Sequence, residues 1–177
     1  MDQSDKLLII INGKGGVGKD TLCEFAGKYY RVRNVSSITP IKEIAAAYGW
    51  KGEKTPRARK FLADLKEAFT QYNDLPTAYL LKQYQEFLAG EEQLMFAHIR
   101  EGSEIEKLKR QVSGRCVTLL VKRSLEGIEA WGNAADDEVE QYHYDYVYQN
   151  CKGLKEAEED FLRCLREILK AERRKPE

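Results

Sequence analysis

Near its start the chain reads Asn12-Gly13-Lys14-Gly15-Gly16-Val17-Gly18-Lys19-Asp20-Thr21, with four glycines and two lysines among these ten residues. The apolar run Leu7–Ile11 before it has the length and composition of a strand buried on both faces of a parallel sheet. Residues 22–29 after it carry apolar side chains at helical spacing. A turn of pattern G-x-x-x-x-G-K between a buried strand and a helix is typical of a phosphate-binding loop. The sequence therefore predicts an α/β protein that binds an anion at this turn.

The residue types of this loop suit the binding of a nucleoside triphosphate. Its glycines let backbone N–H groups turn toward an anion, and the dipole of the following helix adds to the attraction. Lys19 can reach the terminal phosphates, where charge accumulates during phosphoryl transfer. The predicted cofactors are ATP and Mg²⁺, and the predicted cofactor-binding residues of the loop are Gly13, Lys14, Gly15, Gly16, Val17, Gly18, Lys19, Asp20 and Thr21. The alternative is a glycine-rich turn that binds no ligand.

Asp20 departs from the usual pattern, which has Ser or Thr after the lysine. A carboxylate is a hard oxygen ligand, so Asp20 is predicted to hold Mg²⁺ directly or through water. Thr21 then remains as a hydroxyl donor to a phosphate. The alternative is that Asp20 is only a first-turn acid, favoured by the helix dipole.

Length and composition indicate one globular domain over residues 1–177. The chain has 177 residues, and 42% of them are hydrophobic, which is enough for a core. The longest apolar run is far shorter than a membrane span, and the first residues do not resemble a signal peptide. The four cysteines are scattered without a C-x-x-C pair, so we expect reduced thiols, a cytoplasmic location and no membrane partner.

Strand and helix signals alternate along most of the remaining chain. Further strands are predicted at residues 35–38, 94–99, 117–121 and 144–148. Helices are predicted to begin at N-caps Thr39, Thr55 and Ser103, and a last one at Leu154. The pattern predicts a three-layer fold with a parallel sheet of about five strands. Residues 39–90 are expected to form a helical insert, and residues 124–141 a loop.

One helix of the insert carries a predicted apolar face, made of Phe61, Leu62, Leu65, Phe69 and Tyr72. Its first turns hold Arg57, Arg59 and Lys60, although cations there oppose the helix dipole. An anion would offset them, and two arginines can clamp a phosphate bidentately. The alternative is a solvated basic surface.

Positive charge is concentrated in the first part of the chain. The whole sequence has 29 basic and 29 acidic residues, but residues 1–66 have 13 basic and 7 acidic ones. This asymmetry favours local binding of an anion. A protein without an overall basic excess is not expected to bind a nucleic-acid polymer.

The loop resembles those of two families. Lys14–Lys19 is identical to the core of the deviant Walker A loop of partition and cell-division-site ATPases, in which Lys14 would be the signature lysine. Those proteins have Thr at the position of Asp20 and acids at the end of the second strand. Here the corresponding segment, Asn34–Ile38, has no acid.

The Gly-Lys-Asp-Thr sequence resembles the loop of bacteriophage-type deoxynucleoside monophosphate kinases and is similar to that of animal-type phosphomevalonate kinases. The resemblance extends to Lys42-Glu43, Arg57–Leu62, Phe96–Glu101 (with His98 in place of an acid) and Tyr144–Asn150. It implies a P-loop kinase fold in which residues 39–90 bind the acceptor and residues 124–141 form a lid-like loop. The implied reaction is phosphoryl transfer from ATP to a small phosphorylated acceptor, foremost a (deoxy)nucleoside monophosphate.

The resemblance also implies roles for single residues. Lys42, Arg57 and Arg59 would bind the acceptor. Arg100 would act on the transferring phosphoryl group together with Lys19, and it follows a predicted strand at the edge where α/β proteins bind ligands. Arg123 and Asn150 would contact the nucleotide. His98 is either a general base or, as we favour, a strand-end histidine with satisfied hydrogen bonds.

Three functions remain open from the sequence: a kinase, a partition-type ATPase switch that dimerises on ATP, and a nucleotide-binding protein without turnover. A kinase consumes ATP only with an acceptor, whereas a switch ATPase hydrolyses it alone. The sequence leaves the oligomeric state open.

Overall fold

Helices and strands alternate in the computed structural model, which describes residues 6–123 and 138–174. Their order is β1 (Leu7–Asn12), α1 (Lys19–Gly27), β2 (Val32–Ser36), α2 (Thr39–Ala47), α3 (Pro56–Asn73), α4 (Leu75–Ala89), β3 (Leu94–His98), α5 (Gly102–Gln111), β4 (Cys116–Lys122), a short 3-10 helix (Glu138–Glu140), β5 (Tyr146–Gln149) and α7 (Leu154–Arg173). All strand pairs are parallel, in the order β2-β3-β1-β4-β5. The predicted α/β class with five parallel strands is confirmed.

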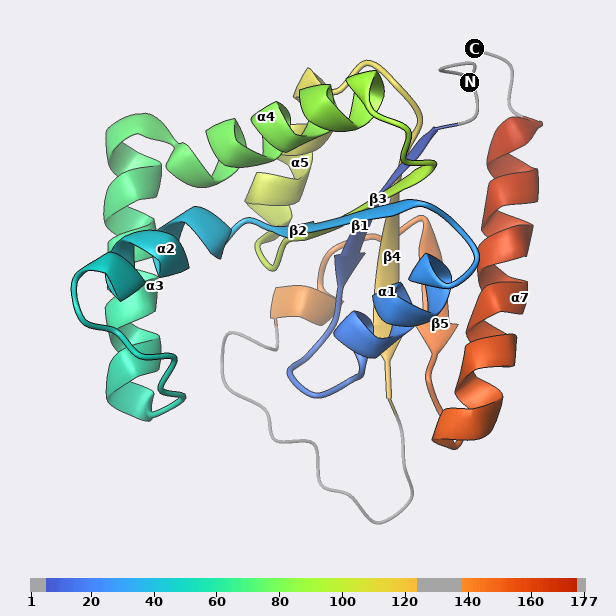
Figure 1. Cartoon of the computed structure of the whole chain (residues 1–177), viewed down its shortest axis with the longest axis horizontal. Helices are drawn as coiled ribbons and strands as arrows, with labels where there is room; N and C mark the ends of the chain where they lie inside the picture. The colour runs from blue at the N-terminus through green and yellow to red at the C-terminus, as the bar shows by residue number, and fades with distance from the viewer. Residues whose placement is uncertain (1–5, 124–137, 175–177) are drawn as a thin grey trace.

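Strand β1 lies at the centre of the sheet, and all six of its residues are buried. Ile9 and Ile11 face a core shared with Phe161 of α7, on the side that α1 and α7 cover (Figure 1). Ile10 faces the opposite core, together with Phe87 of α4. Burial of each such side chain contributes about 1.5–3 kcal/mol, which explains why this apolar run forms the central strand.

Parallel pairing places the carboxyl ends of all five strands at one edge of the sheet. Ile11 of β1 pairs with His98 of β3, and Asn12 pairs with Leu120 of β4. The turn after β1 therefore lies between the ends of β3 and β4.

Two strands differ from their predicted positions. β2 begins at Val32, three residues before the predicted start, and β5 begins at Tyr146, two residues after it, whereas β3 and β4 differ by one residue at one or both ends. β2 is an edge strand, so its ladder with β3 includes Arg33 and Asn34, whose side chains need no burial. An apolar pattern cannot reveal such residues.

The predicted N-cap is correct at Thr55, whereas Thr39 and Ser103 are not N-caps. The Thr55 hydroxyl oxygen accepts a hydrogen bond from the Ala58 N–H at 3.2 Å. Helix α2 begins at Thr39 itself, and α5 begins at Gly102, so Thr39 and Ser103 are both inside their helices. In each case the carbonyl of the preceding loop residue already accepts the first helical bond, which leaves the hydroxyl no capping position.

Helix α3 buries none of its residues, so its predicted apolar face is not a core face. Phe61 is 46% exposed and Tyr72 is 85% exposed. The reason is the position of α3, which contacts α2 and α4 at the side of the sheet (Figure 1). Helices α2 and α3, residues 39–73, thus form a helical arm, whereas α4 packs against the sheet. Most of the predicted lid-like loop, residues 124–137, is outside the described residues.

Within the described chain, no helix combines the length and apolar content that crossing a bilayer requires.

Candidate functional site

The predicted phosphate-binding loop joins the carboxyl end of β1 to the start of α1. Gly13, Gly16 and Gly18 have positive φ angles of 151°, 80° and 93°. A Cβ at Gly13 would come within 2.4 Å of the Val121 carbonyl oxygen, and one at Gly18 would be 2.8 Å from the Asn150 amide. Backbone conformation and close approach together require glycine at both positions.

Asn12 connects the start of this loop to two other elements. Its Oδ1 accepts the Gly13 N–H at 2.8 Å, and its Nδ2 donates to the Arg100 carbonyl at 2.9 Å and to the Tyr144 hydroxyl at 2.8 Å. The residue is 1% exposed. The loop pattern predicts no role for Asn12, although an amide that ends an otherwise apolar strand is a signal for one.

Asn150 supports the loop from the other side. Its Nδ2 donates to the Val17 carbonyl at 2.8 Å, and its backbone N–H donates to the Lys122 carbonyl at 2.7 Å. The resemblance implied that Asn150 contacts the nucleotide. The structure places its buried amide against the loop backbone, where it positions Val17 and Gly18.

The Lys19 side chain extends from the first turn of α1 back to the backbone of the loop. Its Nζ donates to the Gly13 carbonyl at 2.6 Å and to the Lys14 carbonyl at 3.1 Å. The ammonium group is therefore held beside the N–H groups of the turn. A phosphate in the loop would exchange these neutral acceptors for charged ones, and charge-assisted hydrogen bonds are stronger.

Lys14 points away from Lys19, toward the short helix before β5. Its Nζ is 3.6 Å from Oε1 of Glu140, and Lys122 Nζ is 3.7 Å from the other carboxylate oxygen. Glu140 lies in the predicted loop, residues 124–141, and the sequence pattern does not predict its ion pair with Lys14. The three side chains are between 27% and 43% exposed, so the ion pairs are weak.

His98 ends β3 directly beside the first turn of α1. Its Nε2 is 2.8 Å from Asn34 Oδ1, which can only accept a hydrogen bond. The proton of the neutral ring is therefore assigned to Nε2, and the Nδ1 lone pair is left 3.9 Å from Asp20 Oδ1. Burial lowers the pKa of His98, and the Asp20 carboxylate opposes that shift. His98 thus has a satisfied hydrogen bond, as the favoured prediction required.

Cys23 also approaches this histidine, with Sγ 3.7 Å from Nε2. Burial strongly raises the pKa of the Cys23 thiol, and Asp20 adds to the effect. A protonated, buried thiol is neither a nucleophile nor a metal ligand at neutral pH. Cysteine chemistry is therefore not expected at this edge.

The residues around Asp20 fit a nucleotide-bound Mg²⁺ ion. The Asp20 side chain is 90% exposed, and Thr21 follows it on α1. No group of three metal-ligating side chains occurs among residues 6–123 and 138–174. Mg²⁺ usually takes one or two carboxylates and completes its shell with phosphates and water, and the accessible Asp20 carboxylate is a ligand of that kind.

The structure gathers some of the predicted site residues and separates others. Arg100 follows β3 and Arg123 follows β4, so both lie at the same edge as the loop, with exposed side chains. Lys42 is exposed on α2. Arg57 and Arg59 are exposed at the start of α3, on the helical arm (Figure 1). No hydrogen bond or ion pair in the described part of the chain joins either arginine to the loop.

Comparison with known proteins gives structural similarity only. Neither a protein-family model nor a curated protein matches the chain in sequence. Among solved structures, TT1252 from Thermus thermophilus is 18% identical, with a TM-score of 0.54 over 93% of this chain and 98% of that one. Shikimate kinase from Aquifex aeolicus is 12% identical, with a TM-score of 0.56 over 92% and 97%. A gluconokinase from Sinorhizobium meliloti is 11% identical, with a TM-score of 0.52 over 97% of each chain. The chain has the fold of these proteins over nearly its whole length.

Proposed function

We propose that this protein transfers a phosphoryl group from ATP to a small phosphorylated acceptor, in the first place a (deoxy)nucleoside monophosphate. The observation that carries the proposal is the position of Lys19, whose ammonium is held over the glycine loop by the carbonyls of Gly13 and Lys14. The similarity in fold to a shikimate kinase and a gluconokinase supports the hypothesis that this protein is a kinase.

In this proposal the loop binds the β- and γ-phosphates of ATP. Backbone N–H groups of the turn and the N-terminus of α1 attract the anion, and Lys19 stabilises the charge that spreads over the phosphoryl oxygens during transfer. Asn12 and Asn150 fix the loop, so these donors need not reorganise during the reaction. Asp20 would hold Mg²⁺, which, when bound, neutralises phosphate charge, and the Thr21 hydroxyl would donate to a phosphate.

The acceptor phosphate would contact exposed cations outside the loop. Arg100 lies at the loop edge, because its carbonyl accepts a hydrogen bond from Asn12. Arg59, Arg57 and Lys42 lie on the helical arm and have no acidic partner among the described residues. A phosphate acceptor is already ionised at neutral pH, so positioning matters more than a general base, and His98 needs no catalytic role.

The partition-type switch is disfavoured by two observations. Lys14 approaches Glu140 on its own chain, and β2 has no acid. Binding without turnover is favoured by one observation, namely that His98 occupies the end of β3 where the resembling kinases have an acid.

Replacement of the two loop lysines separates these functions. Lys19→Ala should lower acceptor-dependent ADP release by about 10²- to 10³-fold, as expected for the loss of one transition-state donor. Lys14→Ala should change it far less, because Lys14 points toward Glu140. A severe Lys14→Ala defect together with ATP-driven dimerisation would instead identify a switch ATPase.

A further inference from the structure

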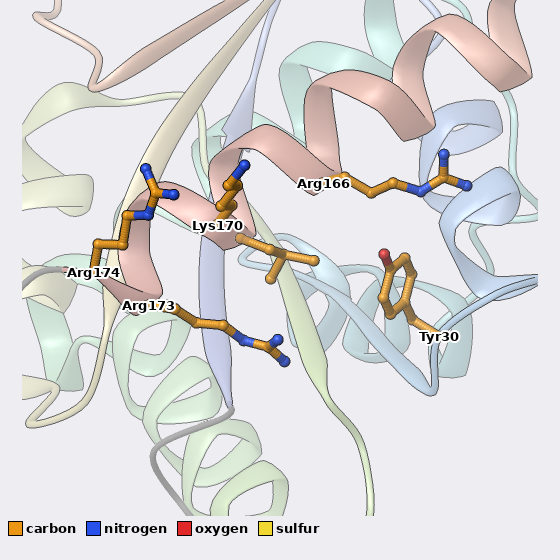
Figure 2. A pocket seen from close by; sticks show the side chains of 6 residues that line it. Tyr30, Arg166, Lys170, Arg173 and Arg174 are labelled. Atoms are coloured by element: carbon orange, nitrogen blue, oxygen red, sulfur yellow. The ribbon is translucent and has the colours of Figure 1, made fainter.

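A second concave site lies at the opposite edge of the sheet from the phosphate-binding loop. It has a volume of about 330 Å³ and is lined by Tyr30, Arg166, Leu169, Lys170, Arg173 and Arg174 (Figure 2). Tyr30 lies just before β2, at the edge of the sheet where the strands begin. The phosphate-binding loop follows the carboxyl end of β1, at the opposite edge. The two sites therefore share no residue. We call this one the α7 pocket.

The α7 pocket has an apolar side and a cationic side. Tyr30 and Leu169 are partly buried and pack against the main core, so the tyrosine ring is a fixed surface. Figure 2 shows Arg166 and Arg173 extending from α7 toward the side where Tyr30 lies, with the tyrosine hydroxyl directed toward the helix. None of the six lining residues is acidic.

The neighbouring surface shows how unusual this lack of acids is. The adjacent cavity, which also includes Tyr30, is lined by Arg33 and Glu92, and Arg33 pairs with Glu92 and Glu86 at 2.8 Å each. On α7 itself, Arg163 pairs with Asp160 at 3.2 Å.

Arg166 and Lys170, by contrast, form no ion pair within the part of the chain that the structure describes. The end of a helix favours cations, which accounts for their presence in the last turns of α7. However, like charges four residues apart on a helix repel, so an anion bound beside α7 would offset this concentration of positive charge.

We propose that the α7 pocket binds a small organic phosphate with a planar body, of which a nucleotide is the simplest example. The phosphate would contact Arg166, with Lys170 adding to the positive charge of the site, and the planar group would lie against Tyr30 and Leu169. Arginine and phosphate form bidentate, charge-assisted hydrogen bonds, and aromatic rings stack on tyrosine. A cavity of this volume matches a small molecule and not a polymer. The proposal does not depend on the proposed kinase activity.

Titration calorimetry with ADP as the probe tests the proposal on the full chain. Wild-type protein should bind two equivalents, one at each site. In the double variant Arg166→Ala/Lys170→Ala, the second equivalent should weaken by roughly 10- to 100-fold. Arg163→Ala removes a cation from the same helix outside the pocket and should retain both equivalents. Lys19→Ala should weaken only the loop site, so failure of the α7 site and failure of the loop site are distinguishable.

The Tyr30→Leu variant and a competing oligonucleotide test the nature of the ligand. Tyr30→Leu keeps an apolar side chain but removes the ring, so it should weaken ADP binding at the α7 pocket and leave pyrophosphate binding there unchanged. Urea unfolding shows whether each variant is folded. ADP binding that is unchanged in the folded double variant, whether the wild type binds one equivalent or two, would overturn the proposal. So would binding at this site of a single-stranded oligonucleotide in preference to ADP.

Discussion

Two asparagine side chains hold the phosphate-binding loop from opposite sides. Asn12 binds the Gly13 N–H, and Asn150 binds the Val17 carbonyl, both at 2.8 Å. Both residues are buried, and a buried polar group left without its partner costs about 1–3 kcal/mol. The conformation of the loop is thus set by contacts that exist before any nucleotide arrives, which is a requirement for electrostatic stabilisation of a transition state.

Asp20 is the residue whose role can be tested most simply. Asp20→Asn keeps the size of the side chain and removes its charge, so Mg²⁺ affinity at saturating ATP should fall roughly tenfold, the effect of about 1.4 kcal/mol. The affinity for metal-free ATP should change much less. Glu24→Gln removes an exposed acid one turn later on α1 and serves as the matched control. Equal Mg²⁺ dependence in the wild type and Asp20→Asn would leave Asp20 only its interaction with the helix dipole.

At the scale of elements, helix α3 carries the proposed acceptor site. Arg59→Lys keeps the charge but loses the planar guanidinium. If Arg59 forms a bidentate hydrogen bond with the acceptor phosphate, KM for the acceptor should rise roughly 10- to 100-fold, while KM for ATP stays nearly constant. Steady-state kinetics with each substrate varied in turn measures both constants.

Each other outcome of this experiment has a clear meaning. Unchanged kinetics, with a change in unfolding free energy within about 0.5 kcal/mol, would show that Arg59 is merely solvated. Equal increases in both KM values would mean that α3 is not the acceptor site.

A buried ion pair connects the helical arm to the sheet. Lys66 of α3 donates to Glu101 at 2.6 Å and to Glu104 of α5 at 2.9 Å. Burial raises the pKa of Glu104, and the Lys66 ammonium opposes that shift. The Lys66 and Glu104 side chains are only 12% and 9% exposed, so this contact differs from the surface ion pairs of α3.

Removal of Lys66 should therefore destabilise the whole protein. Lys66→Met should lower the unfolding free energy by about 3 kcal/mol, because it leaves a buried carboxylate unpaired. Without Lys66 the folded-state pKa of Glu104 rises further above its unfolded value, so the loss should be larger at pH 8 than at pH 5. Lys60→Met breaks an exposed pair with Asp64 and should cost less than about 1 kcal/mol. Similar urea midpoints for both variants would contradict this account.

Elements whose apolar residues enter the core were predictable from the sequence, and elements placed by other contacts were not. The run Leu7–Ile11 and the apolar face of α7 can be buried in only one way, in the cores on the two faces of the sheet. The apolar residues of α3 show the same periodicity, yet Phe61 and Tyr72 remain exposed because no sheet lies beneath them. Periodicity indicates a helix, but it does not specify whether a second layer covers that helix.

The candidate site also has one part that the sequence predicts and another that it does not. The loop from Gly13 to Thr21 was predictable because its glycines and Lys19 follow a fixed pattern in one segment. The contacts of Asn12 with Arg100, and of His98 with Asn34, join residues more than sixty positions apart. Such contacts depend on strand order, which local pattern does not reveal.

On the scale of the whole molecule, the two edges of the sheet have different chemistry. The carboxyl edge holds the predicted phosphate-binding loop, and the amino edge holds the α7 pocket, whose lining among the described residues includes four cations and no acid. The two proposed anion sites therefore lie on opposite edges of a chain whose net charge is zero. Neither site requires a nucleic-acid polymer to explain its charge.

The most direct test of the central proposal measures ADP release from ATP with and without an acceptor. A panel should contain each common ribo- and deoxyribonucleoside monophosphate, with phosphomevalonate and dephospho-coenzyme A as candidate non-nucleotide acceptors, and mass spectrometry should identify the product. We predict negligible ADP release with ATP alone, and stoichiometric formation of ADP and a nucleoside diphosphate with at least one monophosphate. ATP hydrolysis that is independent of every acceptor, or ATP binding without any turnover, would contradict the account.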